Sequence, residues 1–311
     1  MVLVSVIMLI SVAFYIVTER KGLGMLQLRL GPNKVGFKGF VQFLADGVKL
    51  FTKEMITPFQ ASEVLYIVGP MACFTCAYSL WVLFPSIFMP MRVVLGLLLF
   101  ICISSVSVYG VFLTGWSCDS SYSFLGAMRA IAQSVSYEVF LSTCLFCPLV
   151  LVGSFELIES RKMPFPSVLL GLEVMLLWLI CVLAETNRAP FDFVEGESEL
   201  VAGYMVEFGG VSFALLALAE YSNMAFMSML SGCLFFSSFT FSPLVESVFF
   251  GSFMVLIMYF MVWVRGVVPR YRYDLLMSLC WKVLLPLCLC LFMVFSSIWV
   301  EMDCLIKGFK S

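Results

Sequence analysis

Long apolar runs dominate the chain, and polar residues gather in the segments between them. Eight runs approach or exceed the ~20 mainly apolar residues that an α-helix needs to cross a membrane. They are far longer than the ~10 alternating residues of a membrane β-strand, and a helix satisfies its own backbone hydrogen bonds in lipid. The pattern predicts an all-α, polytopic membrane protein with about eight transmembrane helices, over residues 1–18, 64–84, 92–114, 127–152, 166–186, 205–228, 245–265 and 282–300.

A shorter segment, 39–54, alternates apolar residues with Asp46, Lys49, Lys53 and Glu54. It is too short and too charged to cross a membrane, so we expect an amphipathic helix at the membrane surface. The first run has no basic segment before it and no small-residue cleavage site after it, which favours a retained span over a signal peptide. We therefore expect residues 1–311 to form a single transmembrane domain.

Composition supports a membrane protein and excludes several kinds of site. Hydrophobic residues make up 62% of the chain and charged residues only 12%, whereas soluble domains are about a quarter charged. The net charge of −2 and the absence of any Lys/Arg run indicate no nucleic-acid partner. The chain has no histidine, which excludes haem, copper or zinc bound through that residue, and we predict no metal site. The 12 cysteines lie mostly in apolar runs and are interpreted as small buried side chains, with redox or metal roles as the alternative.

Basic residues are distributed unevenly between the two sides of the predicted bundle. Thirteen of the 18 lie at the joints after the first, third, fifth and seventh runs. The positive-inside rule places these joints on the cytoplasmic side, or on the matrix side in a mitochondrion, and both termini on the opposite side. An acidic loop, 187–207, then lies on the basic side.

Several acids interrupt the apolar runs, where burying a charge is costly and usually marks function. Glu138 and Glu220 lie well inside predicted spans, Glu185 ends the fifth, and Glu207 is expected to open the sixth. On one continuous helix Glu220 would lie ~20 Å beyond Glu207. Glu173 and Glu246 lie nearer the ends of their runs and are expected at the interface.

The segment from Glu185 to Glu207 concentrates six acids around a single base, Arg188. In an extended conformation Glu195, Glu197 and Glu199 would point to one side, and their repulsion would couple their protonation. With Glu138 and Glu220 beyond them, they would form a path of protonatable groups into the bilayer; the alternative is a solvated acidic loop. Arg129, which shares a helix face with Gln133, either tunes these carboxylates or extends to the interface.

Six segments, in order, resemble the family of NADH–ubiquinone oxidoreductase chain 1, a membrane subunit of respiratory complex I, of the mitochondrially encoded type. Nearly the whole chain is covered, with departures at Ala189, Phe193 and Phe208. The segments are "TERKGLGMLQLRLGPNKVG" (18–36), "DGVKLFTKE" (46–54), "GAMRAIAQSVSYE" (126–138), "AETNRAPFDFVEGESELVAGYMVEF" (184–208), "AEYSNM" (219–224) and "RYRYDLLMSLCWKVLLP" (270–286).

The resemblance implies a core subunit that forms the tunnel by which ubiquinone, or a rhodoquinone-like quinone, enters from the mitochondrial inner membrane. It assigns Glu19, Arg20, Arg29, Arg265, Arg270 and Arg272 to the charged part of that tunnel, for which matrix-side anchoring is the alternative. It assigns Glu138, Glu185, Asp192, Glu195, Glu197, Glu199, Glu207 and Glu220, with Arg129, to a proton channel.

The same resemblance implies partners among the other complex I subunits, especially the quinone-site subunits of the peripheral arm and neighbouring small membrane subunits. FMN and iron–sulfur clusters would lie in those partners, and this chain would hold no redox centre. Three alternatives remain: a cation/proton transporter, the related subunit of a membrane-bound hydrogenase, and a structural scaffold. A transporter would show repeated halves, and none is evident.

Overall fold

The computed structural model describes residues 2–85, 93–161, 167, 171–192, 203–236 and 243–308. Within these ranges every regular element is helical, which confirms the predicted all-α, polytopic membrane fold. The elements are α1 (Val2–Leu26), η1 (Phe37–Gly39), α2 (Gln42–Thr52), α3 (Glu63–Leu80), η2 (Trp81–Leu83), α4 (Gly96–Ser117), α5 (Ser121–Val152), α6 (Leu157–Arg161), α7 (Leu172–Glu185), η4 (Gly203–Met205), α9 (Val211–Phe235), α10 (Pro243–Val267), α11 (Tyr273–Leu279), η5 (Cys280–Leu284) and α12 (Leu285–Gly308).

Six of the described helical segments are long and apolar enough to cross a membrane: Glu63–Leu83, Gly96–Ser117, Ser121–Val152, Val211–Phe235, Val245–Val267 and Tyr273–Val300. The first and fifth predicted spans fall on α1 and α7. The described part of α7 has 14 residues, and α1 carries Glu19, Arg20 and Lys21 on its helix rather than in the loop after it. The last span is one continuous helix interrupted by a single π-helical turn, η5.

The sixth span begins later than its apolar pattern predicts. The expected start was residue 205, but α9 begins at Val211, so Glu207 precedes the helix instead of opening it. Gly210 explains the difference, because its φ of 62° lies in the left-handed region that a helix does not continue through. Glu220 therefore lies nine residues into α9, or ~13 Å from its start.

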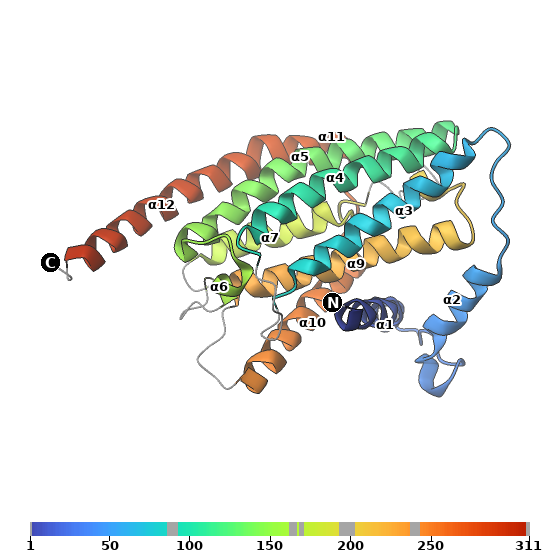
Figure 1. The fold of residues 1–311 in the computed structure, drawn as a ribbon, viewed down its shortest axis with the longest axis horizontal. Coiled ribbons are helices and arrows are strands. Elements are labelled where there is room, and N and C mark those ends of the chain that lie inside the picture. Colours follow the sequence, from blue (N-terminus) through green and yellow to red (C-terminus); the bar gives the residue numbers. More distant parts are fainter. Residues whose placement is uncertain are drawn as a thin grey trace.

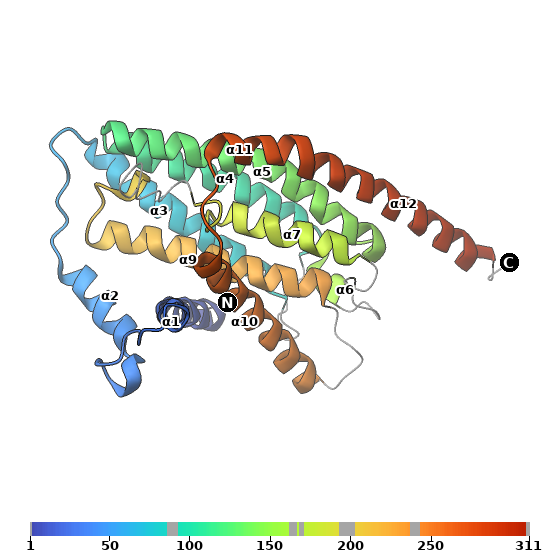
Figure 2. The same ribbon diagram turned by 180° about the vertical axis from the view of Figure 1, so that it is seen from behind.

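The centre of the molecule is a bundle of α3, α4, α5, α7 and α9, with α7 between α5 and α9 (Figures 1 and 2). Small residues let these helices approach closely. A Cβ added to Gly69 on α3 would lie 2.8 Å from the Thr114 side chain of α4, and one added to Gly110 on α4 would lie 2.8 Å from Cys73 Sγ of α3. Such small-residue contacts are typical of membrane helices.

The remaining helices lie around this bundle. α12 runs along α5 and extends beyond it to the C-terminus, whereas α1 and α10 pack on the side of α9 (Figures 1 and 2). The predicted surface helix corresponds to α2, which lies at the edge of the molecule and contacts α1 and α9 (Figure 1). None of its residues is buried, as expected for an amphipathic helix whose apolar face meets another medium.

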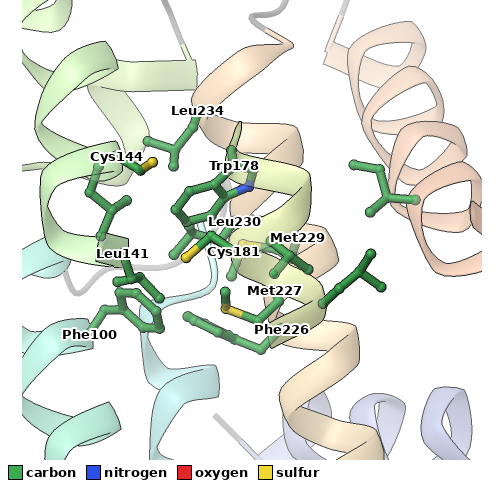
Figure 3. Packing of buried hydrophobic residues seen from close by; sticks show 14 of the residues in the cluster. Phe100, Leu141, Cys144, Trp178, Cys181, Phe226, Met227, Met229, Leu230 and Leu234 are labelled. Carbon is green, nitrogen blue, oxygen red and sulfur yellow. The ribbon is translucent and has the colours of Figure 1, made fainter. Parts of the chain in front are cut away.

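Large apolar side chains fill the core between α4, α5, α7 and α9. Figure 3 shows Trp178 of α7 between Leu141 and Leu234, with Phe226 and Phe100 below it. The Trp178 indole donates a hydrogen bond to Ser231 Oγ at 2.9 Å, which satisfies its one polar group. Of the cysteines within the described ranges, eight are buried, in keeping with the interpretation of most of them as small core side chains.

Candidate functional site: a buried charge cluster and a carboxylate-lined cavity

A buried ion cluster joins three segments that are far apart in the sequence. Glu19, from the last third of α1, is only 4% exposed. Its Oε1 accepts a hydrogen bond from Arg188 Nη1 at 2.6 Å and another from Arg265 Nη1 of α10. Two guanidinium groups on one carboxylate leave this group of three with a formal charge of +1.

Arg188 lies directly after α7, at the start of the acidic loop, and is 8% exposed. Its guanidinium lies over the ring of Tyr221, 4.8 Å from the centroid. Burial has the largest single effect and lowers the pKa of Arg188, but the combined attraction of Glu19, Tyr221 and Glu220 raises it above its ordinary value. The side chain therefore remains a cation at any physiological pH.

The first part of the acidic loop is held in place by a side chain of α5 and by one from the connection between α10 and α11. Gln133 Nε2 of α5 donates to the carbonyl oxygens of Ala184 and Phe191, both at 3.0 Å. Asp192, which is 3% exposed, pairs with Arg270 at 3.2 Å. Gln133 was noted beside Arg129 but was not predicted as a site residue, and the only signal for it was an amide inside an apolar run.

Glu220 lies in a small cavity of about 90 Å³ whose lining combines apolar side chains with several polar ones. Tyr204 of η4 donates a hydrogen bond to Glu220 Oε1 at 2.7 Å. Glu185, at the end of α7, also lines the cavity, together with Asn187 and Asn223. Two carboxylates from different helices therefore line one cavity.

This cavity has the dimensions and the polarity to hold water. A buried water needs ~10–15 Å³ of such volume and two or more polar partners, so the space accommodates several molecules. Glu185 Oε2, Asn187 Oδ1 and Asn223 Oδ1 are buried and lack a hydrogen-bond partner within the part of the chain that the structure describes. Buried oxygens are normally hydrogen-bonded, so these three atoms are suited to water or to a proton.

The other residues assigned to the proton channel lie at varied depths. Glu138 is partly buried on α5, close enough to Glu185 for their charges to interact. Arg129 is partly buried one turn before Gln133, and the Glu207 side chain is exposed. Glu195, Glu197 and Glu199 lie outside the described residues.

The six residues assigned to the quinone tunnel do not form one group. Glu19 and Arg265 meet in the buried cluster, and Arg270 pairs with Asp192. The other three are exposed and lie apart: Arg20 pairs with Asp46 at 2.6 Å, Arg272 pairs with Asp274 at 3.2 Å, and Arg29 lies beside Lys21 and Lys38. Across the described ranges, no three acidic or cysteine side chains gather into a metal-binding set.

A second buried ion pair lies near the start of α10. Arg161, at the end of α6, pairs with Glu246 at 3.1 Å, and its Nη1 donates to the Pro85 carbonyl at 2.9 Å. The Arg161 guanidinium also lies over the Phe250 ring, 4.5 Å from the centroid. Glu246 was expected at the interface, and its side chain is 19% exposed at the end of the bundle.

These features define a polytopic helical membrane protein with ionisable groups buried at helix ends and between helices. The sequence profile of the NADH dehydrogenase family matches residues 1–296. The chain therefore belongs to the NADH dehydrogenase family.

Individual relatives agree over nearly the full length. The chain is 46% identical to NADH-ubiquinone oxidoreductase chain 1 of Heterololigo bleekeri over 296 residues, which cover 93% of each chain. It is 46% identical to the protein of the same name from Artemia franciscana, covering 90% of this chain and 92% of that one. It is 42% identical to that of Lampetra fluviatilis, covering 94% and 93%.

Proposed function

We propose that this chain is a core membrane subunit of the H⁺-translocating NADH–ubiquinone oxidoreductase, embedded in the mitochondrial inner membrane. Membership of the NADH dehydrogenase family and the names of the full-length relatives support this role. Its partners are other subunits of that complex, and its substrate is a quinone. Electron transfer from NADH takes place on FMN and iron–sulfur clusters in partner subunits.

The proposed tunnel for the quinone runs past the end of α1, with partner subunits completing its walls. Glu19, Arg20, Arg29, Arg265, Arg270 and Arg272 supply its charged part. The cluster at Glu19 carries a net positive charge in a buried setting, so it stabilises negative charge that develops when a quinone accepts electrons nearby. Its fixed ion pairs provide that field without rearrangement.

The proposed proton channel begins in the acidic loop, on the matrix side, and continues through the cavity that Glu185 and Glu220 share. That cavity is the observation that carries the proposal, because two carboxylates around a polar space can exchange a proton through water. Glu138 continues the path on α5. Asp192, Glu195, Glu197, Glu199 and Glu207 form its loop section, and Arg129 adjusts the charge beside it.

The test is Glu220→Gln in the assembled complex, with proton pumping and quinone reduction measured together. Removing a protonatable group from a relay is expected to lower pumping by about tenfold or more. NADH oxidation by a water-soluble acceptor, which bypasses the membrane arm, should remain unchanged. If quinone reduction and pumping both continue at normal rates, Glu220 is not part of a relay.

The matched control is Glu173→Gln, because Glu173 is also a glutamate on a predicted span but is exposed near the start of α7. Normal pumping in this variant separates loss of the relay from a general effect of removing a carboxylate. Glu138→Gln tests the next position along the proposed path with the same two measurements.

A further inference from the structure

A long apolar groove lies between α1 and α10, apart from the polar cavity around Glu220. Its volume is about 570 Å³. One face of α1, from Val4 to Thr18, forms one wall, and one face of α10, from Gly251 to Tyr259, forms the other. Trp81 closes the floor. Figures 1 and 2 show both helices on the outer side of the bundle, so the groove opens away from the core.

The rim of the groove faces the surroundings of the bundle. Ile7 on α1 is 56% exposed, and Val255 and Tyr259 on α10 are 64% and 53% exposed. In a membrane-spanning bundle, large apolar side chains at this depth meet hydrocarbon. The groove is therefore accessible from the lipid.

The few hydroxyl groups along the groove are already hydrogen-bonded to protein carbonyls. Ser11 Oγ donates to Met8 O at 2.7 Å, Thr18 Oγ1 to Tyr15 O at 2.8 Å, and Tyr15 Oη to Met258 O at 3.2 Å. An occupant needs no polar groups along its length to satisfy them. The lining of the groove therefore favours an occupant that is a hydrocarbon along its length.

The dimensions of the groove suit a single extended chain. Val4 to Thr18 spans ~21 Å along α1, and the apolar lining continues over this length on both helices. One extended hydrocarbon chain lying along the groove would contact α1 on one side and α10 on the other.

Charge at the two ends of the groove indicates the direction of that chain. Lys21 lies one turn beyond Thr18 on the same face of α1, and the nearby cluster of Glu19 with Arg188 and Arg265 adds a formal charge of +1 at this end. At the other end Glu246 lies just before Gly251 but is paired with Arg161, so this pair adds no net charge. A phosphate headgroup is therefore favoured at the Lys21 end. We infer that the α1–α10 groove binds one acyl chain of an anionic membrane phospholipid, with the phosphate beside Lys21 and the chain end toward Val4 and Gly251.

The probe is a phosphatidylglycerol with a photoactivatable group at the end of one acyl chain, added to the assembled complex in lipid nanodiscs. After illumination, peptide mapping is expected to find label on α1 and α10 near Val4 and Gly251. The inference does not depend on the proposed quinone tunnel, because a lipid can occupy this groove whatever the chemistry at Glu19.

Gly251→Leu supplies a variant that fills the groove without strain. A Cβ at Gly251 meets no atom within 4 Å, so the larger side chain extends into open space. Gly209→Leu, before α9, is the matched control, since Gly209 is equally open and belongs to neither wall of the groove. We expect labelling to fall several-fold in Gly251→Leu and to persist in Gly209→Leu.

Three results would overturn the inference. Equal labelling in the Gly251→Leu variant would place the lipid elsewhere. Displacement of the label by excess long-chain ubiquinone, but not by excess unlabelled phosphatidylglycerol, would assign the groove to the quinone. Absence of label from both helices in the assembled complex would mean that a partner subunit covers the groove.

Discussion

The two ends of α10 carry ion clusters of the same chemistry that differ in charge balance. Glu246 lies in the first turn of α10 and Arg265 in the last. They are 19 residues apart, or ~28 Å along the helix, which is close to the ~30 Å thickness of the hydrocarbon core. One helix therefore anchors a charged group near each surface of the membrane.

The clusters differ in charge balance and in surroundings. Near Glu246 one arginine meets one carboxylate, and the Phe250 ring and the Pro85 carbonyl complete the Arg161 environment. Near Arg265 one carboxylate, Glu19, meets two arginines and leaves a net positive charge. The balanced pair holds helices together, whereas the cluster of three keeps a formal charge of +1 near the acidic loop.

Glu19→Gln is expected to have the largest effect, because it leaves Arg188 buried without a counter-charge. Breaking a buried ion pair from one side costs ~3–5 kcal/mol. We expect a marked fall in assembled complex on native gels. Any complex that does assemble should reduce quinone more slowly, since the field at the end of α1 is altered. Normal assembly and normal quinone reduction would contradict the role of this cluster.

Glu246→Gln tests the opposite end of α10 and is expected to act on stability alone. Glu246 is 19% exposed, and an amide retains one acceptor for Arg161, so the cost should be smaller, at ~1–3 kcal/mol. The melting temperature of the complex should fall, while quinone reduction per assembled complex stays unchanged. Loss of quinone reduction in assembled Glu246→Gln complex, with no loss in Glu19→Gln, would contradict the assignment of the functional charge cluster to the Arg265 end of α10.

Gly126→Ala is expected to disturb the carboxylate cavity without touching a charge. A Cβ at Gly126 would lie 2.9 Å from the backbone of Gly203 and Tyr204, so η4 must move, at a cost of ~1–3 kcal/mol. The hydrogen bond from Tyr204 to Glu220 is then weakened or lost, and the number of protons pumped per electron should fall. Gly209→Ala is the control, because no atom lies within 4 Å of its Cβ, and it should pump normally.

Arg20→Gln is expected to have the smallest effect, although Arg20 is adjacent to Glu19. Its partner Asp46 and Arg20 itself are 33% and 50% exposed, and such surface pairs contribute ~1 kcal/mol or less. The melting temperature of the complex should change little, and the change should be smaller still at high salt, because salt screens exposed charges. Quinone reduction per assembled complex should fall less than in Glu19→Gln, because Arg20 supplies only an exposed portion of the charged part of the proposed tunnel. An unchanged rate would remove Arg20 from that part.

Helix positions were largely predictable because they follow from local pattern. An apolar run long enough to cross a membrane satisfies its backbone hydrogen bonds in lipid by forming a helix. The presence of these helices can therefore be predicted without tertiary information. The start of α9 was misplaced because its run continues through Gly209 and Gly210, and hydropathy does not register a backbone turn. The acids were recognisable as candidates because an ionisable group inside such a run is costly in any fold.

The sequence by itself therefore determined the all-α membrane architecture, the presence of a short amphipathic helix and which acids interrupt the apolar runs. Only the tertiary structure decided which of them meet. Glu19 is joined to Arg188 and Arg265, which are 169 and 246 residues away, and Glu185 shares a cavity with Glu220 from another helix. Helix packing sets these pairings, because it depends on the rotation and close approach of whole helices, which periodicity along one chain does not encode.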